Sequence, residues 1–124
     1  MTSRDQFIQL IETDAGGAYS SKELAQALSV PLGTLNGWLS DKRAFPPAMV
    51  GARKRRVYDV KTIKRIAVYS DCLENSYGMD SSDVRLLLSS IDIEVIWQYY
   101  IKGVAEFASY MIVNRNLLVG GPNG

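Results

Sequence analysis

Apolar side chains recur at helical spacing along the first third of the chain and predict three short helices. The first spans residues 5–13. The second begins after Ser20, because Ser20 and Glu23 three residues later form the capping-box pattern of a helix N-terminus. The third spans residues 31–40 and follows a break at Ser29-Val30-Pro31, since proline is tolerated in the first turn of a helix.

The third predicted helix has two unlike faces. With about 100° between successive residues, one side collects the large apolar residues Leu32, Leu35, Trp38 and Leu39. The other side carries only small or polar residues, namely Gly33, Thr34, Asn36, Gly37 and Ser40. An interior helical glycine costs roughly 1 kcal/mol against alanine, so we interpret this face as one that lets the backbone approach a partner closely. A weak helix supported by tertiary packing is the alternative.

Two β-prone segments follow, after a loop that ends in two prolines. Met49-Val50 and Val57-Tyr58 flank a glycine-containing turn, and this arrangement predicts a β-hairpin. An amphipathic helix is predicted next, over 59–69, capped by Asp59. Two short helices with a tight break, the second exposing a small polar face, are typical of a helix-turn-helix motif, whose second helix enters the DNA major groove.

Charge is unevenly distributed, although the net value is only +1 from 14 basic and 13 acidic residues. Residues 22–65 hold ten bases and three acids, a net charge of +7, whereas 1–21 carry −2 and 66–124 carry −4. A segment this basic attracts polyanions, because neutralising phosphates releases condensed counterions. A solvated charged surface is the simpler interpretation, but the four consecutive bases at 53–56 repel one another unless a partner offsets them.

The composition excludes several kinds of chemistry. The chain has no histidine and one cysteine, Cys72, so it can build neither a Ser-His-Asp or Cys-His nucleophile nor a histidine-bearing zinc site. No intrachain disulfide can form, which favours a reducing, intracellular compartment. Phosphate-binding glycine motifs are absent from the sequence. No long apolar run follows residues 1–5, so we expect no signal peptide. We therefore expect no enzyme activity, no cofactor, no metal, and a cytoplasmic, nucleoid-associated protein.

In their order, these segments resemble the MerR-type winged helix-turn-helix domain, which also occurs in phage excisionases, AlpA-like regulators and some small terminase subunits. The resemblance covers about residues 19–88. It is carried by five segments: Tyr19–Ala25, Val30–Trp38 with its Thr34-Leu35 pair, Phe45-Pro46-Pro47, Arg55–Tyr58 with the helix behind it, and Gly78–Leu88. It implies a mostly α-helical winged helix-turn-helix fold with a small β-hairpin wing, extended here by an N-terminal helix and a hydrophobic C-terminal dimerisation helix.

The resemblance also implies a recognition helix at Pro31–Ser40 and a wing at Met49–Tyr58. The sequence departs from the family within that helix. Family members often have arginine or lysine before the Thr-Leu pair and Arg-Tyr-Tyr after it, where this chain has Gly33 and Asn36-Gly37-Trp38. Affinity is therefore expected to come more from basic residues outside the helix, namely 53–56, Lys42 and Arg43.

The segment 90–118 is apolar almost all round if it forms one helix. Such a helix must be buried or lie in a membrane, and Lys102 and Glu106 near its centre make a membrane span unfavourable. We expect it to form a dimer interface, because MerR relatives dimerise through a C-terminal helix. Packing against the N-terminal helix of the same chain is the alternative. The predicted interface residues are Ile93, Ile96, Trp97, Tyr100, Val104, Phe107 and Met111.

The sequence thus predicts an N-terminal helix over 1–18, a MerR-like winged helix-turn-helix domain over 19–88, an oligomerisation segment over 89–118 and a flexible tail over 119–124. We predict a sequence-specific transcriptional regulator of phage or mobile-element type that binds double-stranded DNA as a homodimer. Two alternatives stay open. One is an architectural factor, either excisionase-like or a small terminase subunit. The other is an interaction module whose basic strip meets an acidic protein.

Each group of predicted DNA-binding residues has an expected role. Thr34, Asn36 and Ser40 face base edges, and Asn36 is the best candidate for bidentate reading of adenine. The basic residues of the wing bind phosphates or an adjacent minor groove, and the lysines contact the sugar-phosphate backbone of the DNA. The full predicted set is Ser21, Lys22, Gly33, Thr34, Asn36, Gly37, Ser40, Lys42, Arg43, Arg53, Lys54, Arg55, Arg56, Tyr58, Lys61 and Lys64.

Overall fold

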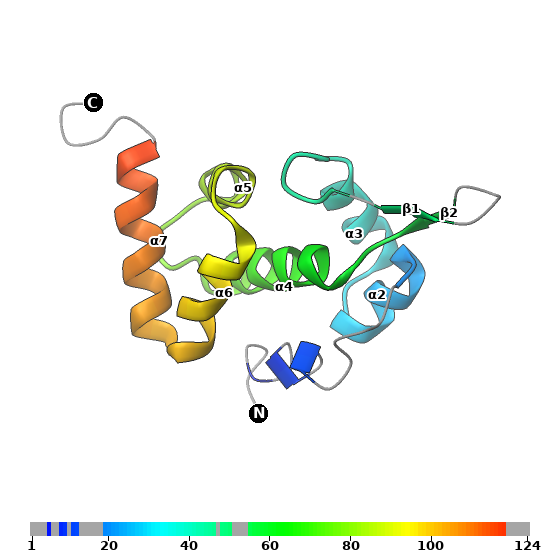
Figure 1. Ribbon diagram of the computed structural model, residues 1–124, viewed down its shortest axis with the longest axis horizontal. Helices are drawn as coiled ribbons and strands as arrows, with labels where there is room; N and C mark the ends of the chain where they lie inside the picture. The colour runs from blue at the N-terminus through cyan, green and yellow to red at the C-terminus, as the bar shows by residue number, and fades with distance from the viewer. Residues whose placement is uncertain are drawn as a thin grey trace. The chain divides into compact units, whose positions relative to one another are not determined.

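The computed structural model describes residues 5, 8, 9, 11, 12, 19–46, 48–50 and 55–118, with the backbone alone for 48–50 and 55–57. These residues are mostly helical (Figure 1). The labelled elements are α2 (Ser21–Leu28), α3 (Leu32–Leu39), β1 (Ala48–Val50), β2 (Arg55–Val57), α4 (Val60–Asn75), α5 (Ser81–Ser90), α6 (Ile93–Lys102) and α7 (Val104–Leu118). The described residues between 5 and 12 are also helical, as predicted for 5–13, whereas the tail beyond 118 lies outside the described part.

The chain divides into two compact units, Met1–Ala67 and Val68–Gly124. The division falls inside α4 and not at residue 88, the end of the predicted DNA-binding segment. The reason is that the second half of α4 and the whole of α5 belong with the C-terminal helices. The two compact units therefore have different boundaries from the predicted segments, which were 1–18, 19–88, 89–118 and 119–124.

In the first unit, α2 begins and ends as the sequence predicts. The Ser20 hydroxyl accepts the backbone N–H of Glu23 (3.3 Å), and the Glu23 carboxylate accepts the backbone N–H of Ser20 (3.1 Å), which completes the capping box. Ser29 ends the helix in the left-handed conformation, with φ 56°. Val30 then donates its N–H to the carbonyl of Ala25 (3.0 Å), and α3 starts at Leu32. The predicted helix, short break and second helix are confirmed.

The strands β1 and β2 pair antiparallel, with Met49 opposite Arg56. Directly after β2, Tyr58 exchanges two backbone hydrogen bonds with Tyr19, at 2.8 and 3.1 Å, which ties the end of the strand pair to the start of α2. β1 contains the predicted first arm, Met49-Val50, whereas β2 begins two residues before the predicted second arm and shares only Val57 with it. The connection over 51–54, which contains the predicted basic tip, lies outside the described residues.

Helix α4 begins where predicted but runs six residues beyond the expected end at 69, to Asn75. The Asp59 carboxylate accepts the backbone N–H of Thr62 (3.1 Å) and caps the helix. The extension places Asp71 in the interior, with no exposed surface. A carboxylate at position 71 is costly to bury unless distant residues supply hydrogen bonds to it. The sequence alone therefore indicates that the helix ends before this residue.

Three donors satisfy the buried Asp71 carboxylate of the second unit. The Tyr100 hydroxyl donates to Oδ2 at 2.6 Å, the Tyr77 hydroxyl to Oδ1 at 3.1 Å, and the Asn75 side-chain amide to Oδ1 at 2.5 Å. The rings of Tyr77 and Tyr100 each pack edge-on against Phe107, with centroids 5.4 and 4.9 Å apart. The network therefore joins the end of α4 to α6 and α7.

Helix α5 follows the glycine at 78. Its first turn is capped by Asp80, which accepts the backbone N–H of Asp83 and the hydroxyl of Ser82, each at 2.9 Å. The bond from Asp83, followed by the one from Ser82, holds the pKa of the Asp80 carboxyl below its usual value. Arg115 of α7 donates to the carbonyl of Gly78 (3.0 Å) and lies 3.7 Å from the Asp83 carboxylate, so α7 is tied to the start of α5.

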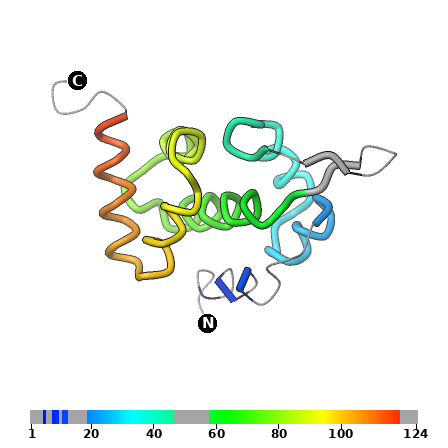
Figure 2. The backbone as a smooth tube through the Cα atoms, viewed as in Figure 1, coloured from blue at the N-terminus to red at the C-terminus, as the bar shows by residue number. Residues whose placement is uncertain are grey.

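The prediction of one continuous C-terminal helix is wrong. Gly103 separates α6 from α7, and the two helices pack on each other, with α5 against α7 (Figure 2). Their apolar faces thus cover one another within one chain. Six of the seven predicted interface residues are at most 5% exposed, and only Val104, 51% exposed, is open. The buried six, which are core residues, are Ile93, Ile96, Trp97, Tyr100, Phe107 and Met111.

Tyr100→Phe should destabilise the protein, because it removes the donor to Asp71 Oδ2 and leaves a buried acceptor short of one bond. We expect a loss of about 1–3 kcal/mol of unfolding free energy, measured by urea denaturation. The matched control is Tyr99→Phe, since Tyr99 stacks on Tyr110 and its hydroxyl makes no hydrogen bond to the described part of the chain. Equal losses in the two variants would contradict the role given to Asp71.

Candidate nucleic-acid interface

Helix α3 shows the two faces that the sequence predicts, with one exception. Leu35 and Leu39 are buried, at 0% and 6% exposure, and anchor the inner side. Trp38 is half-buried. Leu32 was expected on the inner side but is 42% exposed, because it lies in the first turn of α3, beside the break that follows α2. The predicted outer residues are all exposed, and they are Gly33, Thr34, Asn36, Gly37 and Ser40.

No internal contact explains the two glycines of α3. A Cβ atom added at Gly33 or Gly37 would meet nothing within 4 Å in the described structure. Alanine would therefore fit at both positions and would favour the helix. The helix ends just beyond, where the Ser40 hydroxyl donates to the carbonyl of Gly37 (2.6 Å). The glycines leave a strip of α3 backbone without side chains on the outer surface.

Basic side chains lie in the same unit as this strip. Those of Lys22, Lys42, Arg43 and Lys61 are exposed, and that of Lys64 is half-buried. The neutral side chain of Ser21, also predicted to contact DNA, is half-buried. Two acids among them accept hydrogen bonds from backbone amides. Asp41 accepts the N–H of Arg43 (3.2 Å), and Asp59 accepts that of Thr62. By sequence, the first unit has eleven bases and six acids, net +5, and the second has three bases and seven acids, net −4.

The predicted wing is described only in part. Arg55 and Arg56 lie on β2, opposite Val50 and Met49. Arg53 and Lys54 fall outside the described residues. Tyr58 is 4% exposed, so its predicted contact with DNA is wrong. The Tyr58 side chain lies in the core, while its backbone pairs with that of Tyr19. β-Strand propensity alone does not distinguish such a buried position from an exposed one.

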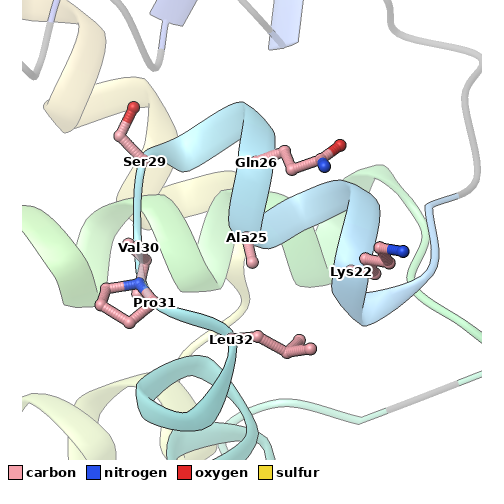
Figure 3. Close-up of a pocket in the computed structure, with 7 residues that line it drawn as sticks. All are labelled: Lys22, Ala25, Gln26, Ser29, Val30, Pro31 and Leu32. Atoms are coloured by element: carbon pink, nitrogen blue, oxygen red, sulfur yellow. The ribbon is translucent and has the colours of Figure 1, made fainter.

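A shallow groove of about 430 Å³ runs along the junction of α2 and α3 (Figure 3). Lys22, Ala25 and Gln26 contribute from α2, and Leu32 from the start of α3, with the break between them completing the wall. Helical periodicity did not reveal this groove, because it groups Leu32 with the buried residues. The usable signal is local: an apolar residue directly after a helix-starting proline has no preceding turn to cover it.

The described residues give no support for a reactive cysteine, a metal site or a membrane span. Cys72 is 2% exposed, and burial, with a smaller effect from the Asp71 charge, raises the pKa of its thiol well above the usual value. The thiol is therefore protonated at neutral pH and is not a nucleophile. Within the described ranges, no three His, Cys, Asp or Glu side chains come together as metal ligands. None of the helices seen there is long and apolar enough to cross a membrane.

Two short helices joined by a three-residue break, the second with a bare outer face, define a helix-turn-helix protein. Residues 19–91, more than half of the chain, match the family described as MerR HTH family regulatory protein, and the chain belongs to that family. Membership assigns it to the DNA-binding transcriptional regulators. No curated protein and no solved structure gives a significant match.

Gly33→Ala and Gly37→Ala should each stabilise the fold, since both positions are helical and open. We expect a gain of about 0.5–1 kcal/mol in unfolding free energy for each variant, from urea denaturation. Gly78→Ala is the control, because its backbone has a φ of 77° and the substitution should destabilise. A loss of stability at Gly33 or Gly37 would show that a contact within the protein requires the glycine.

Proposed function

We propose that the protein is a sequence-specific regulator of phage or mobile-element type, which binds duplex DNA as a homodimer through α3 and the basic strand pair. The observation that carries the proposal is the exposed, bare outer face of α3 in the same unit as exposed Lys22, Lys42 and Arg43. The phage or mobile-element type is inferred from the likeness of residues 19–88 to AlpA-like regulators and excisionases.

In this proposal α3 lies in the major groove and reads base edges. Thr34, Asn36 and Ser40 are exposed and polar. The Asn36 amide offers both a donor and an acceptor, the combination that pairs with adenine N7 and N6. Ser40 donates its hydroxyl proton to Gly37, so its oxygen is left as an acceptor for a base amino group. The glycines let the backbone come close enough for these short side chains to reach.

The basic residues supply affinity and register in this proposal. The proposed wing binds phosphates or the adjacent minor groove through its basic residues. These are Arg55 and Arg56 on β2 and the predicted tip residues Arg53 and Lys54. Lys22, Lys42, Arg43, Lys61 and Lys64 hold the sugar-phosphate backbone beside α3. The net charge of +5 on the first unit favours this unit over the second, whose net charge is −4, as the one that meets the duplex.

Arg55→Ala and Arg56→Ala test the wing. Each change should weaken binding to all duplexes alike and reduce the slope of log affinity against log salt by about one unit, because one phosphate contact is lost. Fluorescence anisotropy over a salt series, with a duplex selected from a random pool, measures both quantities. Lys102→Ala removes an exposed base from the second unit and should change neither. An unchanged slope in both arginine variants would refute the wing.

Homodimerisation is proposed through α7, at positions other than those first predicted. Val113 and Leu117 lie one turn apart on α7 and are 54% and 67% exposed, so they offer an uncovered apolar strip. Val104, at 51% exposure, is the one residue of the original set that remains available. A footprint with one palindromic operator supports a regulatory dimer, whereas a phased array of sites would indicate the architectural role.

Combining Val113→Asp with Leu117→Asp should convert the protein from dimer to monomer, because carboxylates are costly to bury in an apolar contact. Sedimentation equilibrium at micromolar concentration measures the change. Gln98→Glu adds a charge at an exposed polar position of α6 and should leave the dimer intact. A wild-type protein that is monomeric where it binds DNA would reject the dimer.

A further inference from the structure

The first turn of α3 carries an apolar side chain that the core does not use. Leu32 is 42% exposed, whereas Leu35 and Leu39 of the same helix are buried. Single exposed leucines are common on protein surfaces. This one lies at the N-terminal end of the second helix of a helix-turn-helix motif, which is the end that reaches base edges in the major groove. An apolar side chain at this position would lie against the molecule that the helix binds.

Leu32 lies beside one basic side chain, in a groove whose other lining residues are both polar (Gln26, Ser29) and apolar (Ala25, Val30, Pro31). It lines the groove between α2 and α3 together with Lys22 and Gln26, and in Figure 3 the Lys22 and Leu32 side chains extend to the same side. Asn36 is exposed one turn further along α3. Gly33, the next residue, has open space where a side chain would be. A polyanion can thus come close to Leu32 without meeting a bulky neighbour.

The isolation of Leu32 favours a duplex over a protein partner. Among the residues of the first unit whose side chains the structure describes, Leu32 is the only large hydrophobic residue that is exposed. A protein interface needs a cluster of apolar side chains at its centre. A single leucine next to a lysine matches the major groove, where an isolated methyl group lies among polar atoms and phosphates.

We propose that Leu32 contacts the C5-methyl group of a thymine and sets a preference for thymine at one position of the bound site. Thymine is the base that presents a methyl group in the major groove. The contact places apolar surface against apolar surface, while Lys22 binds a nearby phosphate and Asn36 reads a base one turn along α3. This inference rests on the proposed function, because it requires that α3 enters the major groove.

Deoxyuridine substitution tests the contact directly, because it removes only the methyl group. Each thymine of a duplex selected by the wild-type protein is replaced in turn, and affinity is measured in about 150 mM salt. At one position the wild-type protein should lose about three- to fivefold in affinity. Leu32→Ala should bind the thymine duplex more weakly by a similar factor and show no further loss with deoxyuridine. Leu32→Met, which keeps a long apolar side chain, should retain the dependence.

The control is Leu73→Ala, since Leu73 of α4 is also 42% exposed but lies in the second unit. This variant should keep the full thymine dependence. If Leu32→Ala keeps it as well, or if no single deoxyuridine weakens the wild-type protein, the contact is refuted while duplex binding stands. If the wild-type protein selects no duplex at all, the proposed function fails and the contact fails with it.

Discussion

The outer face of α3 can be bare only because its inner face is firmly held. An eight-residue helix with two interior glycines is unstable in isolation, since each glycine costs roughly 1 kcal/mol and short helices are marginal in water. Buried Leu35 and Leu39 compensate by packing in the first unit. Beyond the helix, Asp41 orders the following turn, and the Thr62 hydroxyl of α4 donates to the carbonyl of Pro46 (2.7 Å). These contacts fix α3 from inside, so its exposed residues are available for recognition.

The second unit is stabilised differently, around one buried carboxylate. Asp71 is held by hydroxyl groups from Tyr77 and Tyr100, and the aromatic rings of both pack on Phe107. This arrangement uses the apolar residues of α6 and α7 within the chain. It leaves an exposed apolar strip on α7 and a net negative charge on the unit. The two units thus differ in net charge and in the kind of surface that they expose.

Local signals in the sequence predicted where α2 and α4 begin and which residues form the outer face of α3, but not where α4 ends. The capping pair Ser20 and Glu23, and the cap Asp59, each act through hydrogen bonds within a few residues, which is why they could be recognised. The break at Gly103 could not be recognised, because a single glycine in an apolar run is compatible with a helix interior as well as with a helix end. Nor could the burial of Asp71, whose donor Tyr100 lies 29 residues away. The burial of Tyr58 depends likewise on which neighbours the fold supplies.

The central claim is that the outer face of α3 meets the duplex. Amide chemical shifts of ¹⁵N-labelled protein, recorded during titration with a selected duplex, test it most directly. We expect the largest chemical-shift changes at the amides of Gly33, Thr34, Asn36 and Gly37, and little change at those of α6. Changes concentrated in α6 and α7, with the amides of α3 unmoved at saturation, would contradict it.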